Sequence, residues 1–221
     1  MSKQNIERKP PKGSVKFSLN LSSEQKLAKT QILKHPFNFI VGKAGSGKTL
    51  LAVQVALDQF FKRQFNRIII TRPTISTEDN GFLPGSEREK MEPWLVPIRS
   101  NMRKIYNKPE VLERMEKSEQ IELVSLAHFR GRTFDNSVVI VDEFQNLTRS
   151  QLAMAVGRLG KDSKMIFCGD SYQIDLRDKQ HSAYHDMAKL TNSKYVFKTV
   201  LTDSHRHAAI EDLLELLNGY H

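Results

Sequence analysis

The sequence contains a single cysteine and no long hydrophobic run, and these two shortages limit what the protein can be. With Cys168 alone, no internal disulfide can form, which fits a reducing compartment. No apolar stretch approaches the roughly 18 residues that a transmembrane helix needs, and the first residues carry no apolar segment of the signal-peptide type. We therefore expect a cytoplasmic protein with no membrane partner.

The charge is unbalanced toward the positive side. The 221 residues include 34 lysines and arginines against 25 acidic residues, a formal net charge of +9. Such a balance favours polyanionic partners, although a solvated basic surface explains it equally well. Part of the excess lies in residues 1–18, which are polar and contain Pro10 and Pro11. We expect a flexible basic arm at 1–18, followed by one domain at 19–221.

Residues 42–49 match a complete phosphate-binding pattern: a glycine, four residues and then Gly-Lys-Thr. The apolar run at 37–41 before it is typical of a buried strand, and the apolar residues at 50–57 after it are spaced for a helix. Glycines let backbone N–H groups surround phosphate oxygens, and the helix N-terminus adds positive potential. The pattern predicts a nucleotide-binding loop made of Gly42, Lys43, Ala44, Gly45, Ser46, Gly47, Lys48 and Thr49.

The pattern at 42–49 is called a P-loop, and two of its side chains have separate expected roles. Lys48 would reach the β- and γ-phosphates and act in catalysis, and the Thr49 hydroxyl would bind Mg²⁺. ATP and Mg²⁺ are accordingly the expected cofactors, and the chain is expected to contain a P-loop ATPase domain.

Two further strand ends carry polar residues suited to hydrolysis. An apolar run at 138–141 leads into Asp142, which can hold the metal, and Glu143, which can orient or deprotonate the attacking water. Alone, such an acidic pair is more often a helix cap, but beside a complete P-loop it indicates hydrolysis. After the run at 164–168, Gln173 is a candidate for facing the γ-phosphate. An ordinary turn explains its spacing equally well.

Strands alternate with helices along the chain, which predicts an α/β fold around a mostly parallel sheet. Helices are expected after Ser22, after the P-loop, from Thr148 to Gly160, and near the C-terminus. Strands are expected at 37–41, 67–71, 121–124, 138–141, 164–168 and 195–201.

The connection at about 72–118 is rich in proline and contains the only tryptophan, Trp94. A connection this long usually has a function or helices of its own, so we expect a functional insertion at the edge of the sheet. Trp94 or Phe82 could stack nucleic-acid bases there, although both residue types more often belong to a core. A basic cluster follows, formed by Arg99, Arg103, Lys104 and Lys108.

Taken together, the motifs of this chain resemble those of the PhoH family of ATPases. The resemblance runs from about Leu21 to Leu217, and the family's core is similar to the first RecA-like domain of superfamily 1 helicases. This chain departs from the family pattern at Phe129 and at residues 204–207, which read Ser-His-Arg-His. The residues that carry the resemblance are the P-loop, residues 71–73 and 81–85, Glu89, Lys90 and Pro93, residues 130–133, 142–146 and 163–165, Gly169, Asp170, and residues 173–176.

The resemblance implies roles for several of these residues. Gln25 lies where related helicases place an adenine-reading glutamine, although its spacing from Ser22 equally predicts a capping box. Gln173 matches the glutamine of the helicase Gly-Asp-x-x-Gln motif, which favours a contact with the γ-phosphate. Thr71, Arg72 and the loop at 81–85 lie where such proteins contact single-stranded nucleic acid.

The resemblance also implies an incomplete site. Superfamily 1 helicases have a second RecA-like domain that supplies arginines across the nucleotide, and this sequence has no length for one. We expect a neighbouring protomer to supply the arginine, with Arg206 the first choice and Arg158 the second, in a homo-oligomeric ring such as a hexamer. Arg130 and Arg132 could contact phosphate or a neighbouring subunit, or form an ordinary surface pair.

The predicted function is therefore Mg²⁺-dependent ATP hydrolysis in an oligomer, coupled to binding or remodelling single-stranded RNA or DNA as in helicases. The alternative is a nucleoside-type P-loop kinase. Glu143 and Gln173 favour hydrolysis, because such kinases usually lack a hydrolytic glutamate beside the metal-binding aspartate.

Overall fold

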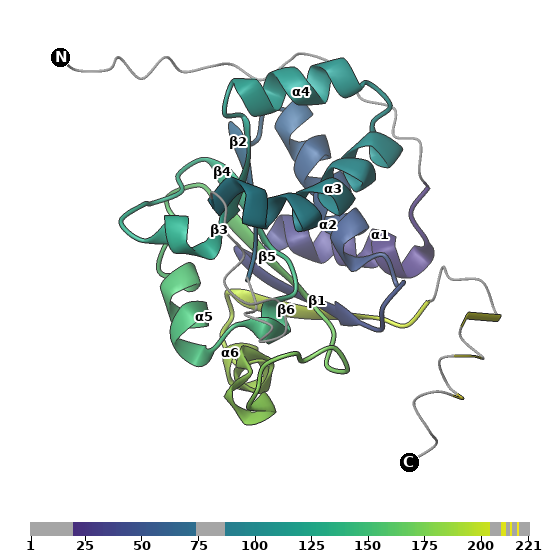
Figure 1. The fold of residues 1–221 in the computed structure, drawn as a ribbon, viewed down its shortest axis with the longest axis vertical. Coiled ribbons are helices and arrows are strands. Elements are labelled where there is room, and N and C mark those ends of the chain that lie inside the picture. The colour runs from purple at the N-terminus through teal and green to yellow at the C-terminus, as the bar shows by residue number, and fades with distance from the viewer. Residues whose placement is uncertain (1–19, 74–86, 204–208, 211–212, 214–215, 217–221) are drawn as a thin grey trace.

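The computed structural model describes residues 20–73, 87–203, 209–210, 213 and 216 (Figure 1). The basic arm predicted at 1–18, the loop at 81–85, Arg206 and most of the helix expected near the C-terminus lie outside the described residues. Within the described part of the chain, none of the helices has the length and hydrophobicity needed to span a bilayer.

A six-stranded parallel sheet forms the centre of the molecule. Its order is β3-β2-β4-β5-β1-β6, so β1, which precedes the P-loop, lies between β5 and β6. The six predicted strands are confirmed, with ends that differ from the expected ranges by one residue at most. They are β1 (Phe37–Gly42), β2 (Arg67–Arg72), β3 (Ile121–Ser125), β4 (Ser137–Val141), β5 (Lys164–Gly169) and β6 (Val196–Leu201).

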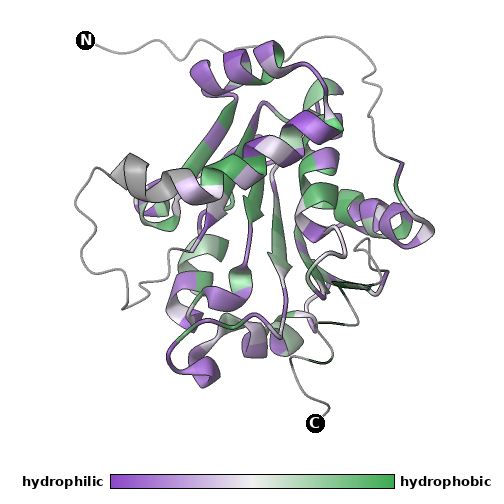
Figure 2. Ribbon diagram, turned by 45° about the vertical axis from the view of Figure 1, so that its right-hand side comes forward, coloured by the Kyte–Doolittle hydropathy of each residue, from purple (hydrophilic) through white to green (hydrophobic). Residues whose placement is uncertain are grey.

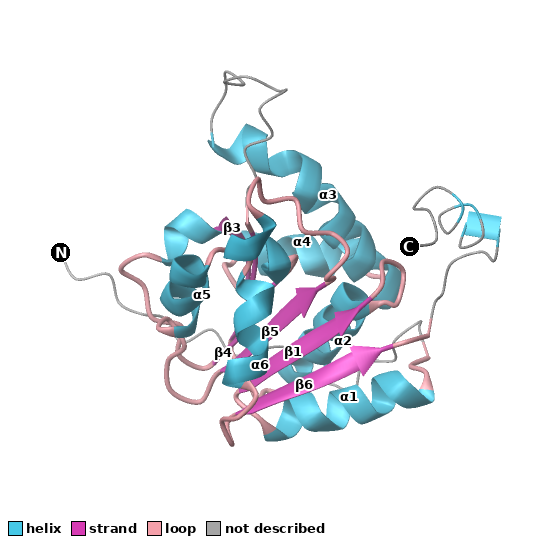
Figure 3. Ribbon diagram, turned by 90° about the horizontal axis from the view of Figure 1, so that it is seen from below, coloured by secondary structure: helices cyan, strands magenta, loops and turns pink. Residues whose placement is uncertain are grey.

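Helices cover both faces of the sheet, as Figures 1 and 3 show. One face carries α1 (Ser23–Lys34), α2 (Lys48–Phe61), α3 (Glu87–Ile105) and α4 (Pro109–Lys117). The other carries α5 (Arg149–Val156), α6 (Met187–Leu190) and the 3-10 turns η2 (Leu126–Phe129), η3 (Phe144–Asn146) and η5 (Ala183–Asp186), while η4 (Lys179–His181) precedes η5. This arrangement confirms the predicted α/β fold.

The four inner strands, β1, β2, β4 and β5, are buried on both sides because each contributes to two cores. Side chains of a strand alternate between the faces of its sheet. On β4, Val138 and Ile140 pack against the α1–α4 face, while Val139 and Val141 pack against the α5–α6 face. Figure 2 shows mostly hydrophobic residues along these strands and a mixture of hydrophilic and hydrophobic residues along the surrounding helices. Burial on both sides explains why the strands appear in the sequence as continuous apolar runs.

The helix predicted from Thr148 to Gly160 begins as expected but ends early, so the predicted end is wrong. Thr148 forms the expected capping box with Gln151, and the helix stops at Val156. Gly160 instead donates its N–H to the carbonyl of Phe134 at 3.0 Å. A Cβ on Gly160 would lie 2.1 Å from Asp135 Oδ1. The glycine is therefore required for the close approach of two chain segments, a nonlocal contact that the helical pattern does not reveal.

The long connection between β2 and β3 contains α3 and α4 in its described part. Ile98, Met102 and Ile105 of α3 join the core above α2, and α4 packs on the edge strand β3. Trp94 also packs against this core, and its Nε1 is buried with no partner among the described residues. Trp94 therefore contributes to packing rather than to an exposed stacking surface.

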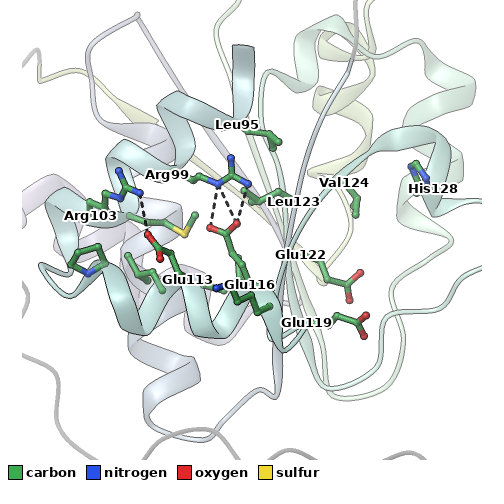
Figure 4. A pocket seen from close by; sticks show the side chains of 15 residues that line it. Leu95, Arg99, Arg103, Glu113, Glu116, Glu119, Glu122, Leu123, Val124 and His128 are labelled. Atoms are coloured by element: carbon green, nitrogen blue, oxygen red, sulfur yellow. Dashed lines mark hydrogen bonds and ion pairs between the residues drawn. The ribbon is translucent and has the colours of Figure 1, made fainter. Parts of the chain in front are cut away.

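Part of the predicted basic cluster is neutralised within the chain. Arg99 pairs with Glu116 of α4 at 3.0 Å, and Arg103 approaches Glu113 at 3.6 Å, as Figure 4 shows. These pairs line a groove of about 890 Å³ between α3, α4 and β3. Lys104 and Lys108 are exposed.

Candidate nucleotide site

The P-loop, the acidic pair and the Gln173 turn follow the carboxyl ends of three parallel strands. The P-loop follows β1, Asp142 follows β4, and Asp170 follows β5, which lies between the other two strands. In open α/β sheets this edge is where ligands bind. The sheet order thus brings together residues that are far apart in the sequence.

The P-loop has a backbone shape that its glycines make possible. Gly45 and Gly47 have φ angles of 90° and 79°, in the left-handed region that favours glycine. Gly47 caps α2, which begins at Lys48. A Cβ on Gly42 would lie 2.4 Å from the carbonyl oxygen of Leu201, so the loop also depends on a close approach of β6. The helix N-terminus adjoins a loop shaped to bind an anion.

The polar groups of the loop fit a phosphate ligand. Lys48 Nζ donates to the carbonyl oxygens of Gly42 at 2.6 Å and Lys43 at 2.9 Å, which keeps its ammonium over the loop. Ser46 Oγ is buried without a hydrogen-bond partner among the described residues. A buried hydroxyl without a partner is costly, and a phosphate oxygen would satisfy it.

The two predicted metal ligands are in direct contact. Thr49 Oγ1 donates to Asp142 Oδ1 at 2.7 Å, although 93 positions separate the two residues. Burial, and then the negative charge of Glu143, raises the pKa of Asp142 to about 6. A divalent cation would offset both causes. Among the described residues no group of three or more His, Cys, Asp or Glu side chains gathers around a common point.

The raised pKa of Asp142 predicts a pH-dependent stability in the metal-free protein. The folded chain holds this proton more tightly than the unfolded chain, whose reference pKa is 3.8. Protonated Asp142 stabilises the folded state fully below pH 3.8, and this stabilisation is lost as the pH rises through about 6. We expect Asp142→Asn to be more stable than the wild type by roughly 2–3 kcal/mol at neutral pH, with little difference near pH 4. Urea unfolding at several pH values with a chelator measures this, and a pH-independent difference would contradict it.

Glu143 is held by contacts on both of its carboxylate oxygens. Its Oε2 accepts a hydrogen bond from Gln145 Nε2 at 2.5 Å, and its Oε1 lies 3.8 Å from Arg72 Nη2. The Glu143 backbone has a φ of 54°, a left-handed conformation uncommon outside glycine. Such strain persists where surrounding contacts determine the conformation, and it often occurs at functional sites.

The two glutamines predicted to face the nucleotide differ in their surroundings. Gln25 forms the expected capping box with Ser22, and its Nε2 also donates to the carbonyl of Ser46 in the P-loop at 3.4 Å. One side chain thus serves both the helix cap and the loop, and its contact with adenine stays a prediction. Gln173 is exposed on the turn after β5, and its backbone carbonyl accepts a hydrogen bond from Gln145.

Two of the arginines considered from the sequence make contacts away from the P-loop. Arg132 pairs with Glu122 at 2.6 Å and its guanidinium lies over the Phe134 ring. Arg158 follows α5, and its carbonyl accepts from Phe134, close to the amino ends of β4 and β5. Arg158 therefore lies at the edge of the sheet opposite the P-loop.

Gln145 is the site residue to which sequence reasoning assigned no role. It belongs to the family motif at 142–146, but its spacing from the other polar residues does not indicate a chemical function. In the structure it is fully buried. Its side chain donates a hydrogen bond to the Glu143 carboxylate and another to the turn that contains Gln173. Only the fold reveals these partners.

The fold and the site define the class: a P-loop protein whose candidate nucleotide site lies at the carboxyl ends of its strands. A model of the PhoH-like protein family matches residues 19–218, and the chain belongs to this family. It is 42% identical over 152 residues to a PhoH-like protein from Synechocystis sp., covering 68% of this chain and 46% of that protein. It is 38% identical over 181 residues to one from Bacillus subtilis, covering 80% and 56%. The chain thus spans about half the length of these relatives.

Solved structures support the fold. The large terminase of a thermophilic bacteriophage superposes with a TM-score of 0.54 and 12% identity, covering 89% of this chain and 50% of the terminase. The same terminase in complex with ADP gives a TM-score of 0.50 with 13% identity and the same coverage. At this identity the likeness concerns the fold alone. Family and fold together support nucleotide binding and an ATPase-type enzyme.

Proposed function

We propose that this chain hydrolyses ATP with the help of Mg²⁺. The observation that carries the proposal is the 2.7 Å contact between Thr49 Oγ1 and Asp142 Oδ1. With these two side chains in contact, one metal ion would reach both the P-loop and the acidic strand end. The partnerless hydroxyl of Ser46 and the raised pKa of Asp142 support the same interpretation, because a phosphate and a cation would satisfy them.

Each site residue has a defined task in this proposal. The N–H groups of the P-loop and Lys48 bind the β- and γ-phosphates, and Thr49 and Asp142 hold the metal. Bound Mg²⁺ would neutralise charge that develops on the phosphate oxygens. Glu143 orients the attacking water and accepts its proton, while Gln173 approaches the γ-phosphate from the next strand end. Gln25 contacts the adenine from α1.

Single-stranded nucleic acid is the partner that we propose for the β2 end of the site. Arg72 ends β2 and lies 3.8 Å from the carboxylate of Glu143, so a phosphate bound there would act directly beside the hydrolytic group. The net charge of +9 and the exposed Lys104 and Lys108 favour a polyanion.

A homo-oligomeric ring, such as a hexamer, is the assembly that we propose. Among the described residues, Arg72 lies near the hydrolytic pair, and it is already paired with Glu143. A transition-state arginine from a neighbouring protomer would complete the site, with Arg206 the first candidate and Arg158 the second.

The experiment that tests the function is phosphate release from ATP with Mg²⁺ and no acceptor, titrated with single-stranded RNA and DNA at several salt concentrations. We expect release without an acceptor, and stimulation by at least one polymer that weakens steeply as salt rises, because phosphate contacts release counterions. Lys48→Ala is the matched control for a contaminating ATPase. Phosphate transfer only to an added nucleoside would favour the kinase alternative. A rate that ignores both polymers would remove the nucleic-acid part and leave the ATPase.

A further inference from the structure

The side chain of Gln145 contacts both strand ends that carry the proposed hydrolytic residues. Its Nε2 donates both to Glu143 Oε2 at 2.5 Å and to the carbonyl of Gln173 at 3.0 Å. Its Oε1 accepts from the backbone N–H of Asp170 at 3.2 Å. One buried amide thus joins the end of β4 to the turn that follows β5.

The partners of this amide determine its orientation. A carboxylate and a carbonyl only accept, and a backbone N–H only donates, so the amide has a single arrangement that satisfies all three. Turning it over would point Oε1 at the Glu143 carboxylate and at the Gln173 carbonyl. That arrangement is repulsive and leaves the Asp170 N–H without its acceptor.

The surroundings of Gln145 hold it in place. Ser182 Oγ donates to the Gln145 carbonyl at 2.5 Å, which ties the η3 turn to the segment ahead of η5. The preceding residue, Phe144, packs against Phe39 and Tyr184 in the core. A Cβ on Gly169 would lie 2.5 Å from the Phe144 ring and 2.9 Å from Gln145 Oε1. Glycine at the end of β5 leaves the space that Gln145 occupies.

We propose that Gln145 is a positioning residue that holds the Glu143 carboxylate and the Gln173 turn as one rigid unit. The proposal rests on the proposed function, because it concerns the water-orienting carboxylate and the turn that approaches the γ-phosphate. Without Gln145, the side-chain partner that Glu143 keeps among the described residues is the more distant Arg72, and its carboxylate turns away from the position that orients water. The Gln173 turn loses its link to β4 at the same time.

The test compares Gln145→Met with the wild type in the full chain. We expect unchanged affinity for a non-hydrolysable ATP analogue and a kcat lower by about 10²-fold, the scale of a misplacement near 1 Å. Asn38→Leu is the matched control, since Asn38 is a buried amide on β1 that donates to the His35 carbonyl at 2.8 Å, at the opposite end of the sheet. The control removes a buried amide away from the candidate site and is expected to keep its kcat.

A double variant shows whether Gln145 acts through Glu143. If it does, Glu143→Gln combined with Gln145→Met hydrolyses ATP at the same residual rate as Glu143→Gln alone, because the shared step is already lost. Hydrogen exchange gives a readout independent of turnover: the Asp170 amide is expected to exchange faster in Gln145→Met and to stay protected in Asn38→Leu. Should Gln145→Met not fold, Gln145→Asn keeps a buried amide that is too short for all three partners and takes its place.

Several outcomes would overturn the proposal while leaving the ATPase function standing. They are a wild-type kcat in the Gln145 variant, a loss of nucleotide affinity as large as the loss of kcat, fully additive effects in the double variant, and unchanged exchange at Asp170. A wild-type chain that releases no phosphate would instead remove the proposed function, and this proposal with it.

Discussion

Replacing Glu143 with glutamine is expected to lower the rate of ATP hydrolysis by about 10²–10⁴-fold, the usual contribution of a general base. The glutamine keeps the size of the side chain, and its oxygen can still accept the hydrogen bond that Gln145 Nε2 donates. It cannot take a proton from water. Nucleotide affinity should persist, because the P-loop and the Thr49–Asp142 contact are unchanged.

Single-turnover hydrolysis and a separate binding titration measure the two effects of Glu143→Gln. Glu122→Gln is the matched control, because Glu122 is also a half-buried carboxylate paired with an arginine, Arg132, but lies on the edge strand β3. The control should hydrolyse ATP at the wild-type rate. Hydrolysis by Glu143→Gln at that same rate would assign the base to another residue.

Replacing Arg206 with alanine is expected to lower hydrolysis by about 10³–10⁵-fold, the range observed for arginine fingers. The guanidinium would stabilise charge on the transferring phosphoryl group, and nucleotide binding should change little. Arg206 lies outside the described residues, so the prediction rests on the family resemblance and on the need for a further cation. The measurement is the specific rate as a function of protein concentration, for the wild type and the variant.

Mixing two inactive variants gives the sharper test of a finger supplied in trans. A protomer with Arg206→Ala has an intact P-loop site, and a protomer with Glu143→Gln has an intact arginine. In a head-to-tail ring, mixed interfaces combine the two intact halves, so activity should return on mixing. Arg158→Ala, which removes the second candidate, distinguishes the two arginines. A high rate from a monomeric wild type, independent of concentration, would exclude the idea.

The site was predictable to the extent that it depends on consecutive residues. The P-loop is a continuous stretch whose glycines are required by its own backbone, and Asp142 directly follows a run of buried apolar residues. The inner strands were predictable for the same reason, since a strand covered by helices on both faces is mostly apolar. The end of α5 was not, because Gly160 is needed for contact with the segment at Phe134 and Asp135 rather than for a helix cap.

Charge and polar contacts between distant residues were the least predictable. A run of cations in α3 appears as a basic cluster in the sequence, yet α4 folds back and pairs Arg99 with Glu116. Gln145 likewise has no periodicity or spacing that marks it, because its partners at Asp170 and Gln173 come from another strand end.

By itself, the sequence determined the six strands, the first two helices, the start of α5 and the P-loop, because each depends on neighbouring residues and their backbone preferences. The tertiary structure alone decided how these parts meet. The order β3-β2-β4-β5-β1-β6 brings Thr49 to Asp142, buries the carboxylate until its pKa rises to about 6, and places one amide between Glu143 and the Gln173 turn. Distance, burial and hydrogen-bond partners between residues far apart in the chain arise only when the sheet forms.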